Sequence, residues 1–173
     1  EIAAGHFDVD VIRLVSIDAE RTCSSFIRGA LAVGDVDAAA RHLGRPFRVG
    51  GVVVVGDQRG RELGFPTANL PVAAGLATPA DGVYAGWVRR ADQPSAVRMP
   101  AAISVGVNPT FNGVERRVES YVLDRTDLEL YGRDITVEFV RHLRGQVRFG
   151  SVDDLIAQMN KDVAATRVVL GVD

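Results

Sequence analysis

The residues best suited to chemistry lie in one polar segment, 56–69, which follows the apolar stretch 49–55. Its glycines and arginines are Gly56, Arg59, Gly60, Arg61 and Gly64. Glycines let backbone amides approach an anion, and arginines neutralise the anion's charge. Thr67 and Asn69 then offer a hydroxyl and an amide oxygen, which are hard neutral ligands suited to Mg²⁺. The segment therefore predicts a site for a phosphate group and Mg²⁺.

A simpler interpretation of the same segment stays open at this point. The Walker A pattern G-x-x-x-x-G-K-[S/T] is absent, and no helical pattern follows the segment. A cluster of Gly, Pro, Thr and Asn between two strands is usually only a loop. The residues alone thus allow either a phosphate site or an ordinary connection.

Five stretches of the chain have the composition and the turn-bounded length of β-strands. They are 49–55, 83–90, 97–107, 117–123 and 134–141. Clusters of Gly, Pro, Asn and Asp separate them, and no helix intervenes. Strands in direct succession favour an antiparallel sheet, and closure into a Greek-key barrel removes the edges of so small a sheet. We expect a mainly β fold built on such a barrel.

Both ends of the chain have other patterns. From Ser151, apolar residues recur at helical spacing to near the C-terminus, which predicts one amphipathic helix against the barrel. Residues 7–17 alternate as a half-buried strand would, and two short helices are predicted around Gly34. Gly44, Arg45 and Pro46 end the second helix. We place a domain boundary there, giving segments 1–44 and 45–173.

The composition restricts the partners of the protein. With Lys+Arg 20 against Asp+Glu 22, the net charge of −2 provides no general field for nucleic acid or an anionic membrane. No apolar stretch has the length of a membrane span, and a single cysteine, Cys23, cannot form an internal disulfide. A cytoplasmic enzyme is the expectation, and nothing in the pattern selects or excludes self-association.

The run from Gly51 to Asn69, which ends in Pro-Thr-Ala-Asn, resembles the signature of the riboflavin kinase family. Further matches follow in the family's order: D-G-V-Y-A-G at 81–86, G-V-N-P-T-F at 106–111, V-E-S-Y-V-L-D at 118–124, D-L-E-L-Y-G at 127–132, F-V-R-H-L-R at 139–144 and F-G-S at 149–151. The resemblance extends from about Gly44 to the C-terminus. Several ordered motifs over most of a domain make it specific.

The resemblance implies a fold and an activity. The fold would be a six-stranded antiparallel barrel with a C-terminal helix, one strand more than the pattern shows. The activity would be transfer of the γ-phosphoryl group of ATP to the 5′-hydroxyl of riboflavin, giving FMN and ADP. Thr67 and Asn69 would bind Mg²⁺ and the phosphates, and the loop from Gly56 to Gly64 would wrap the phosphates through backbone amides and Arg59 or Arg61.

Three more roles follow from the resemblance. Glu119 would be the catalytic base, Tyr131 would lie near the nucleotide and Arg144 would contact the flavin. Strand alternation puts Glu119 on the side opposite Val118 and Ser120, and without the resemblance it would be read as a solvated strand residue. The chain departs from the family's pattern at Gln146, where relatives commonly carry an acidic residue, and at Tyr121, where some carry histidine.

The first 44 residues resemble the end of the FMN adenylyltransferase domain of bifunctional bacterial riboflavin kinase/FAD synthetases. Cys23-Ser-Ser-Phe-Ile-Arg28 is similar to that domain's triphosphate-binding Ser-Ser-Thr-x-Ile-Arg motif. The chain has 3 histidines, none in the adenylyltransferase His-x-x-His or His-x-Gly-His pattern, so we expect that activity to be absent.

Two alternatives to the kinase remain. One is a barrel that binds flavin or a nucleic acid without catalysis, and the other is adenylyltransferase function kept by residues 1–44. The three hypotheses predict different products, namely FMN, none, or FAD.

Overall fold

The structure is a computed structural model. It describes residues 10–56, 59–73, 75–93, 98–110, 113–125 and 128–173, and the side chains of residues 59, 108–110 and 113–115 also lie outside the description. Among the helices of the described residues, none is both long and apolar enough to span a membrane.

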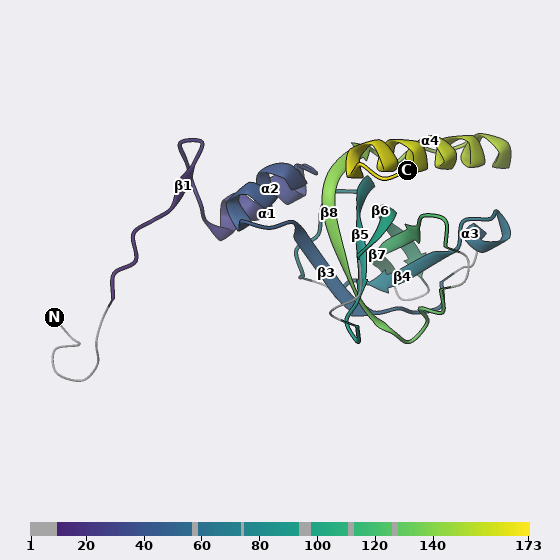
Figure 1. The fold of residues 1–173 in the computed structure, drawn as a ribbon, viewed down its shortest axis with the longest axis horizontal. Helices are drawn as coiled ribbons and strands as arrows, with labels where there is room; N and C mark the ends of the chain where they lie inside the picture. The colour runs from purple at the N-terminus through teal and green to yellow at the C-terminus, as the bar shows by residue number, and fades with distance from the viewer. Residues whose placement is uncertain (1–9, 57–58, 74, 94–97, 111–112, 126–127) are drawn as a thin grey trace.

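Six antiparallel strands form one strongly curled sheet (Figure 1). They are β3 (Phe47–Val52), β4 (Thr67–Pro71), β5 (Gly82–Arg90), β6 (Met99–Thr110), β7 (Gly113–Val122) and β8 (Asp134–Arg144), in the spatial order β3-β8-β5-β6-β7-β4. The meander β5-β6-β7, with β8 returning beside β5, is a Greek key. The edge strands meet at a single bridge, where Val54 N donates to Asn69 O at 2.9 Å. The predicted six-stranded antiparallel fold is confirmed, as a curled sheet joined at this seam.

The strand that the sequence pattern did not show is β4, which begins inside the polar segment at Thr67. Polar and apolar residues alternate in it only from Thr67 to Leu70, a run too short before Pro71 to stand out from the surrounding turn residues. Just before it, Arg59–Glu62 forms one helical turn, α3, where the sequence pattern indicated only a loop. The polar segment is therefore a short helix leading into an edge strand.

The core fills the inner face of the sheet. Its largest fully buried side chains on the strands include Tyr84, Ile103, Val118, Ile135 and Phe139. β5 and β8 approach so closely at a bulge that a side chain on Gly86 would collide with Glu138 O. Only glycine fits this crossing. The next residue, Trp87, is half-buried and lies under Arg98. The guanidinium carbon of Arg98 is 4.3 Å from the centroid of the Trp87 ring.

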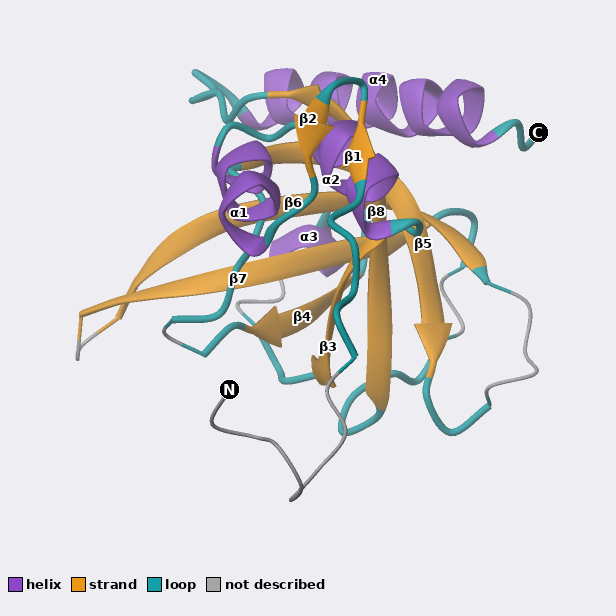
Figure 2. Ribbon diagram, turned by 90° about the vertical axis from the view of Figure 1, so that its left-hand side faces the viewer, coloured by secondary structure: helices purple, strands orange, loops and turns teal. Residues whose placement is uncertain are grey.

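The predicted C-terminal helix is α4 (Val152–Leu170), which lies along the outside of the sheet, against β5, β6 and β8 (Figure 2). The Ser151 hydroxyl caps its first turn by accepting from Asp154 N, and Gly171 ends it in the left-handed conformation at φ 63°. The predicted apolar stripe is only partly buried. The most buried residues of α4 are Asp162 and Thr166, so a polar contact anchors this helix to the barrel.

The predicted strand over 7–17 is wrong for residues 10–15, and among the described residues of that range only Ser16–Ile17 forms a strand. Residues 10–15 have no regular structure, Val11 and Ile12 are exposed, and residues 7–9 lie outside the described ones. β1 (Ser16–Ile17) pairs only with β2 (Glu20–Arg21) in a two-residue ladder. A strand pattern requires a partner strand, and no other described strand lies beside this segment.

The two predicted helices around Gly34 are confirmed as α1 (Ser24–Ala32) and α2 (Val36–Leu43). Their residues Leu31, Val36 and Ala39 are buried in the same hydrophobic cluster as the barrel core. Ala80 N also donates to Leu31 O at 2.8 Å. The domain boundary near residue 44 stays a prediction, and the packing is continuous across it.

Candidate functional site

The register of three strands brings the candidate ligands and the candidate base together. Asn69 on β4 is the partner of Glu119 on β7, and Glu119 is also the partner of Ser104 on β6. Directly paired residues of an antiparallel sheet have Cβ atoms about 4.5–5.5 Å apart on one face. Asn69, a predicted Mg²⁺ ligand, and the Glu119 carboxylate are thus neighbours in one row across the sheet.

Thr67 and Asn69 contact each other through their side chains. The Asn69 amide nitrogen donates to Thr67 Oγ1 and to Thr67 O, both at 3.3 Å, and Asn69 is buried. Gly56 lies so close above this amide that a Cβ there would be 2.6 Å from Asn69 Oδ1. The pair offers two neutral oxygen ligands, which fit Mg²⁺ when phosphates and water complete its shell.

A cleft of about 680 Å³ opens beside Thr67, and we call it the nucleotide cleft because residues predicted to bind the nucleotide line it. Three of the predicted nucleotide-binding residues, Arg61, Thr67 and Tyr131, line it together. Its remaining wall includes the polar residues Ser120, Arg125 and Glu129 and apolar residues of the barrel mouth, among them Val53, Val122, Leu128 and Leu130. A cleft with cations at one part and apolar walls at another is suited to a nucleotide.

Two further clefts lie on the outer face of the sheet, and Glu119 lines both. The first, about 250 Å³, lies between the sheet and α4, and its walls include Tyr121, Phe149, Leu155 and Met159. Thr67 lines it too, so Thr67 separates this α4 cleft from the nucleotide cleft.

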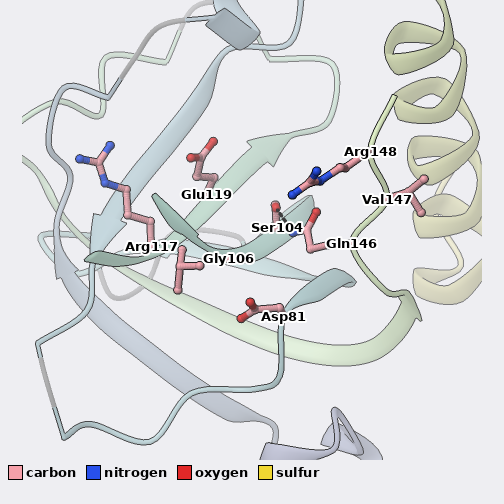
Figure 3. A pocket seen from close by; sticks show the side chains of 9 residues that line it. Asp81, Ser104, Gly106, Arg117, Glu119, Gln146, Val147 and Arg148 are labelled. Atoms are coloured by element: carbon pink, nitrogen blue, oxygen red, sulfur yellow. Dashed lines mark hydrogen bonds between the residues drawn. The ribbon is translucent and has the colours of Figure 1, made fainter. Parts of the chain in front are cut away.

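The second cleft that Glu119 lines, about 510 Å³, is more polar (Figure 3). Its lining residues are Asp81, Ser104, Gly106, Val107, Arg117, Glu119, Gln146, Val147 and Arg148. Because Ser104, Glu119 and Gln146 line both this polar cleft and the α4 cleft, the two are contiguous.

Glu119 has the orientation that strand alternation predicts. Its neighbours Val118 and Ser120 are fully buried on the inner face, whereas Glu119 is half-buried and faces the outer clefts. The carboxylate is therefore accessible to a ligand and still shielded in part from bulk water.

The structure places Arg144 on the wall of the α4 cleft, but its guanidinium is engaged by α4. Arg144 Nε and Nη2 donate to the two oxygens of Asp162 at 2.9 and 2.6 Å. Gln158 donates to the same carboxylate at 2.9 Å. Arg144 thus joins β8 to α4 in this structure, and its contact with flavin stays a prediction.

The glycines of the polar segment shape the turn before β4. Phe65 N donates to Gly60 O at 2.7 Å, so the chain folds back immediately after α3. Gly64 has φ +86°, a conformation that side chains disfavour. Gly60 lines the α4 cleft and Arg61 the nucleotide cleft, while the side chain of Arg59 lies outside the described residues.

Sequence reasoning did not assign to the site several residues that line the clefts. They are Phe65, Ser104, Arg117, Arg125, Phe149, Arg148 and the α4 residues Leu155 and Met159. Phe65 packs edge-on against Tyr121, with 5.2 Å between ring centroids. The sequence carried signals for two of them, since Phe65 lies in the run from Gly51 to Asn69 and the motif F-G-S contains Phe149, but neither signal gives a place in a cleft.

Comparisons with known proteins identify the family to which this chain is similar. The family model for riboflavin kinases, Flavokinase, matches residues 43–170. The bifunctional riboflavin kinase/FMN adenylyltransferase of Haemophilus influenzae is 37% identical over 161 residues, covering 93% of this chain and 51% of that protein. The protein of the same name from Pseudomonas fluorescens is 38% identical over 164 residues, covering 94% and 51%. The chain thus spans about half the length of the curated relatives it matches.

Two solved structures are similar to the fold. A crystal structure of riboflavin kinase from Trypanosoma brucei has a TM-score of 0.54 and 27% identity, covering 73% of this chain and 78% of that one. A structure described as a macrolide-efflux protein from Streptococcus pneumoniae has a TM-score of 0.80 and 36% identity, covering 90% of this chain and 50% of that one. With the family match over most of its length, this chain belongs to the riboflavin kinase family.

Proposed function

We propose that the protein is a riboflavin kinase, which transfers the γ-phosphoryl group of ATP to the 5′-hydroxyl of riboflavin and releases FMN and ADP. The observation that carries the proposal is the pairing of Asn69 with Glu119, which sets phosphate-side ligands beside a carboxylate between the nucleotide cleft and the outer clefts. Family membership and the printed function of the relatives support the same reaction.

The nucleotide would occupy the cleft of about 680 Å³. Arg61 and Arg125 there carry positive charge for the phosphates, and Tyr131 with the apolar wall would contact the base. Thr67 and Asn69 would hold Mg²⁺, which when bound neutralises charge on the β- and γ-phosphate oxygens. The backbone around Gly56 and Gly60 can approach the phosphates because neither residue has a side chain.

Riboflavin would occupy the outer clefts. The apolar side chains of Phe149, Leu155 and Met159 are suited to the planar ring system, and the ribityl chain would extend toward Glu119. Its 5′-hydroxyl then lies at the place where the clefts meet, next to Thr67. Phosphoryl transfer chiefly asks a protein to position two substrates and to stabilise charge, and this arrangement supplies both.

Glu119 would act as general base. The 5′-oxygen attacks the γ-phosphorus, its proton passes to the Glu119 carboxylate, and the bond from the γ-phosphorus to the bridging oxygen breaks with its electrons left on ADP. A positioned general base typically contributes about 10²–10⁴-fold to a rate.

The test is incubation of the purified chain with riboflavin, ATP and Mg²⁺, followed by chromatographic separation of riboflavin, FMN and FAD. We expect FMN from the wild type, no FAD, and loss of FMN when Mg²⁺ is omitted. Glu119→Gln should lower kcat by about 10² or more, because amide nitrogen and oxygen cannot accept the proton. Asn69→Ala should raise the Mg²⁺ requirement and lower kcat.

Glu20→Gln is the matched control. Glu20 lies on β2, away from the clefts, and its replacement by glutamine removes the same charge. It should leave kcat unchanged. FMN formation by Glu119→Gln at the wild-type rate would remove the general base from the proposal. Tight binding of riboflavin without any FMN from the wild type would instead indicate a flavin-binding barrel without catalysis.

A further inference from the structure

The connection between β8 and α4, residues 145–151, is held against the sheet at two points. At its start, Arg144 is fixed by the paired hydrogen bonds to Asp162. Two residues later, Gln146 Nε2 donates to Ser104 Oγ at 3.1 Å and to Val105 O at 3.0 Å. The position where family relatives commonly carry an acidic residue thus holds an amide that donates to β6. A carboxylate could not donate to the Val105 carbonyl, so this anchor depends on glutamine.

The Gln146 anchor brings the connection beside the candidate base. Ser104, whose hydroxyl oxygen accepts the hydrogen bond from the Gln146 amide, is the strand partner of Glu119. Arg148 follows two residues after the anchor and lines the polar cleft with Glu119 (Figure 3). The figure shows the Arg148 side chain extending from the connection toward Ser104 and Glu119.

Arg148 is exposed at the cleft and differs from two neighbouring arginines in its lack of an ion pair among the described residues. Arg144 is paired with Asp162, and Arg116 is paired with Asp81 at 2.8 Å. Arg148 has no hydrogen-bond or ion-pair partner within the described part of the chain. An arginine whose side chain lies in a cleft without a protein partner can bind an anionic ligand at no cost of breaking an ion pair.

We propose that Arg148 binds the transferred phosphoryl group, in the transition state and as the 5′-phosphate of FMN; this inference rests on the proposed kinase function. Riboflavin brings a neutral hydroxyl to this place, whereas the product brings a phosphate dianion. An arginine in the cleft that Glu119 lines would interact with the product phosphate and with the charge that develops during transfer, but little with riboflavin itself. Arg148 is therefore a residue that distinguishes FMN from riboflavin.

The test compares the Kd values of FMN and riboflavin by flavin fluorescence, for the wild type, Arg148→Gln and Arg148→Lys, in the presence of MgADP. We expect Arg148→Gln to weaken FMN binding by about tenfold or more and to change riboflavin binding by less than about twofold, because only FMN loses a charge-assisted hydrogen bond. Arg148→Lys should be intermediate, since it keeps the charge but not the paired donors. The kcat of Arg148→Gln should fall while KM for riboflavin stays near the wild-type value.

Arg21→Gln on β2 is the control with the same loss of charge, and it should change neither Kd. Equal weakening of both flavins by Arg148→Gln would show contact with the ring or ribityl chain and would overturn the proposal, as would unchanged FMN binding. Circular dichroism and the Tm of each variant exclude misfolding, and Arg148→Lys gives the same comparison if the glutamine variant does not fold. Absence of FMN formation by the wild type would refute the kinase function alone, because the ratio of the two Kd values is measured without turnover.

Discussion

Tyr84 shows at the scale of one residue how the barrel and the N-terminal helices are joined. It is fully buried, its hydroxyl donates to Ala80 O at 2.7 Å, and its ring packs against Phe139 and His142. A Cβ at Gly34 would lie 3.2 Å from this hydroxyl, so the turn between α1 and α2 rests directly on it. Burial, assisted by the nearby Asp81 carboxylate and partly opposed by Arg116, raises the pKa of Tyr84 to about 12.

Replacement of Tyr84 by phenylalanine tests this contact through its pH dependence. At neutral pH, Tyr84→Phe loses one hydrogen bond, and we expect the free energy of unfolding to fall by about 1 kcal/mol. The unfolded wild type releases the phenol proton from about pH 10, whereas the folded protein keeps it to about pH 12. The stability that this group contributes is therefore present below pH 10 and lost between pH 10 and pH 12.

Urea unfolding of the wild type and Tyr84→Phe, at neutral pH and at increasing pH above 10, measures the difference between their free energies of unfolding. Because the other titrating groups are common to both proteins, the difference isolates Tyr84. We expect it to shrink through this window, and a constant difference would contradict a raised pKa at Tyr84.

At the scale of elements, the polar contact between β8 and α4 can be tested separately from the row that contains Asn69 and Glu119. The Arg144 and Asp162 side chains are 20% and 9% exposed, so their ion pair is largely shielded from water. Removal of one member of such a pair leaves the other charge uncompensated, which costs more than the pair itself contributes. The position of α4, and with it the wall of the α4 cleft, depends on both members being present.

We expect Asp162→Ala to lower the free energy of unfolding by about 2–3 kcal/mol and to weaken riboflavin binding, because Arg144 and Gln158 lose their common acceptor. Asp153→Ala in the same helix is the control, and its exposed side chain should cost about 0.5 kcal/mol or less. Chemical denaturation and a riboflavin titration measure the two effects. Equal losses in the two variants would mean that the pair does not fix α4.

The elements also show which parts of the structure can be predicted from the sequence. The β7 pattern is clear because Val118 and Ser120 are buried while Glu119 faces the clefts, so the orientation of Glu119 followed from alternation alone. β4 was not predicted because its alternation lasts only from Thr67 to Leu70 and its Thr, Asn and Pro residues are also typical of a loop. Residues 10–15 have the pattern of a strand but lack a partner strand among the described residues, and pairing is a property that no local pattern contains.

In the candidate site too, features set by local sequence were predictable and features set by tertiary structure were not. Thr67 and Asn69 were recognisable because they are neighbours in the chain and belong to a specific motif. The proximity of Ser104 to Glu119 depends on strand register, and the engagement of Arg144 by Asp162 depends on where α4 packs. Such relations arise from tertiary structure, and a single sequence does not specify them.

At the scale of the whole molecule, the hydrophobic core extends beyond the segment that the family model matches. Leu31, Val36 and Ala39 precede residue 43 and are almost completely buried with the barrel residues. The ion pair of Asp37 with Arg141, at 3.2 Å, adds a contact at the edge of this packing. The α1–α2 helices therefore act as a cover for one side of the barrel.

Two truncated chains test the role of this cover. Removal of residues 1–14, whose described part is exposed and irregular, should change the free energy of unfolding by less than about 1 kcal/mol. Removal of residues 1–44 exposes the surface that Leu31, Val36 and Ala39 cover, and should cost about 4 kcal/mol or more. Thermal and urea unfolding provide the measurement. Equal stability of both truncated chains would show that the barrel does not need the helices.

The position of Trp87 has an optical consequence. It is the single tryptophan of the chain, it lies under Arg98 on β5, and it lines none of the three clefts described above. A flavin bound in the outer clefts would not touch the indole, yet its near-ultraviolet absorption overlaps tryptophan emission, so resonance energy transfer would quench Trp87. Adenine nucleotides do not absorb in that region. The intrinsic fluorescence of the unlabelled protein can therefore report a flavin added to the protein separately from an added adenine nucleotide.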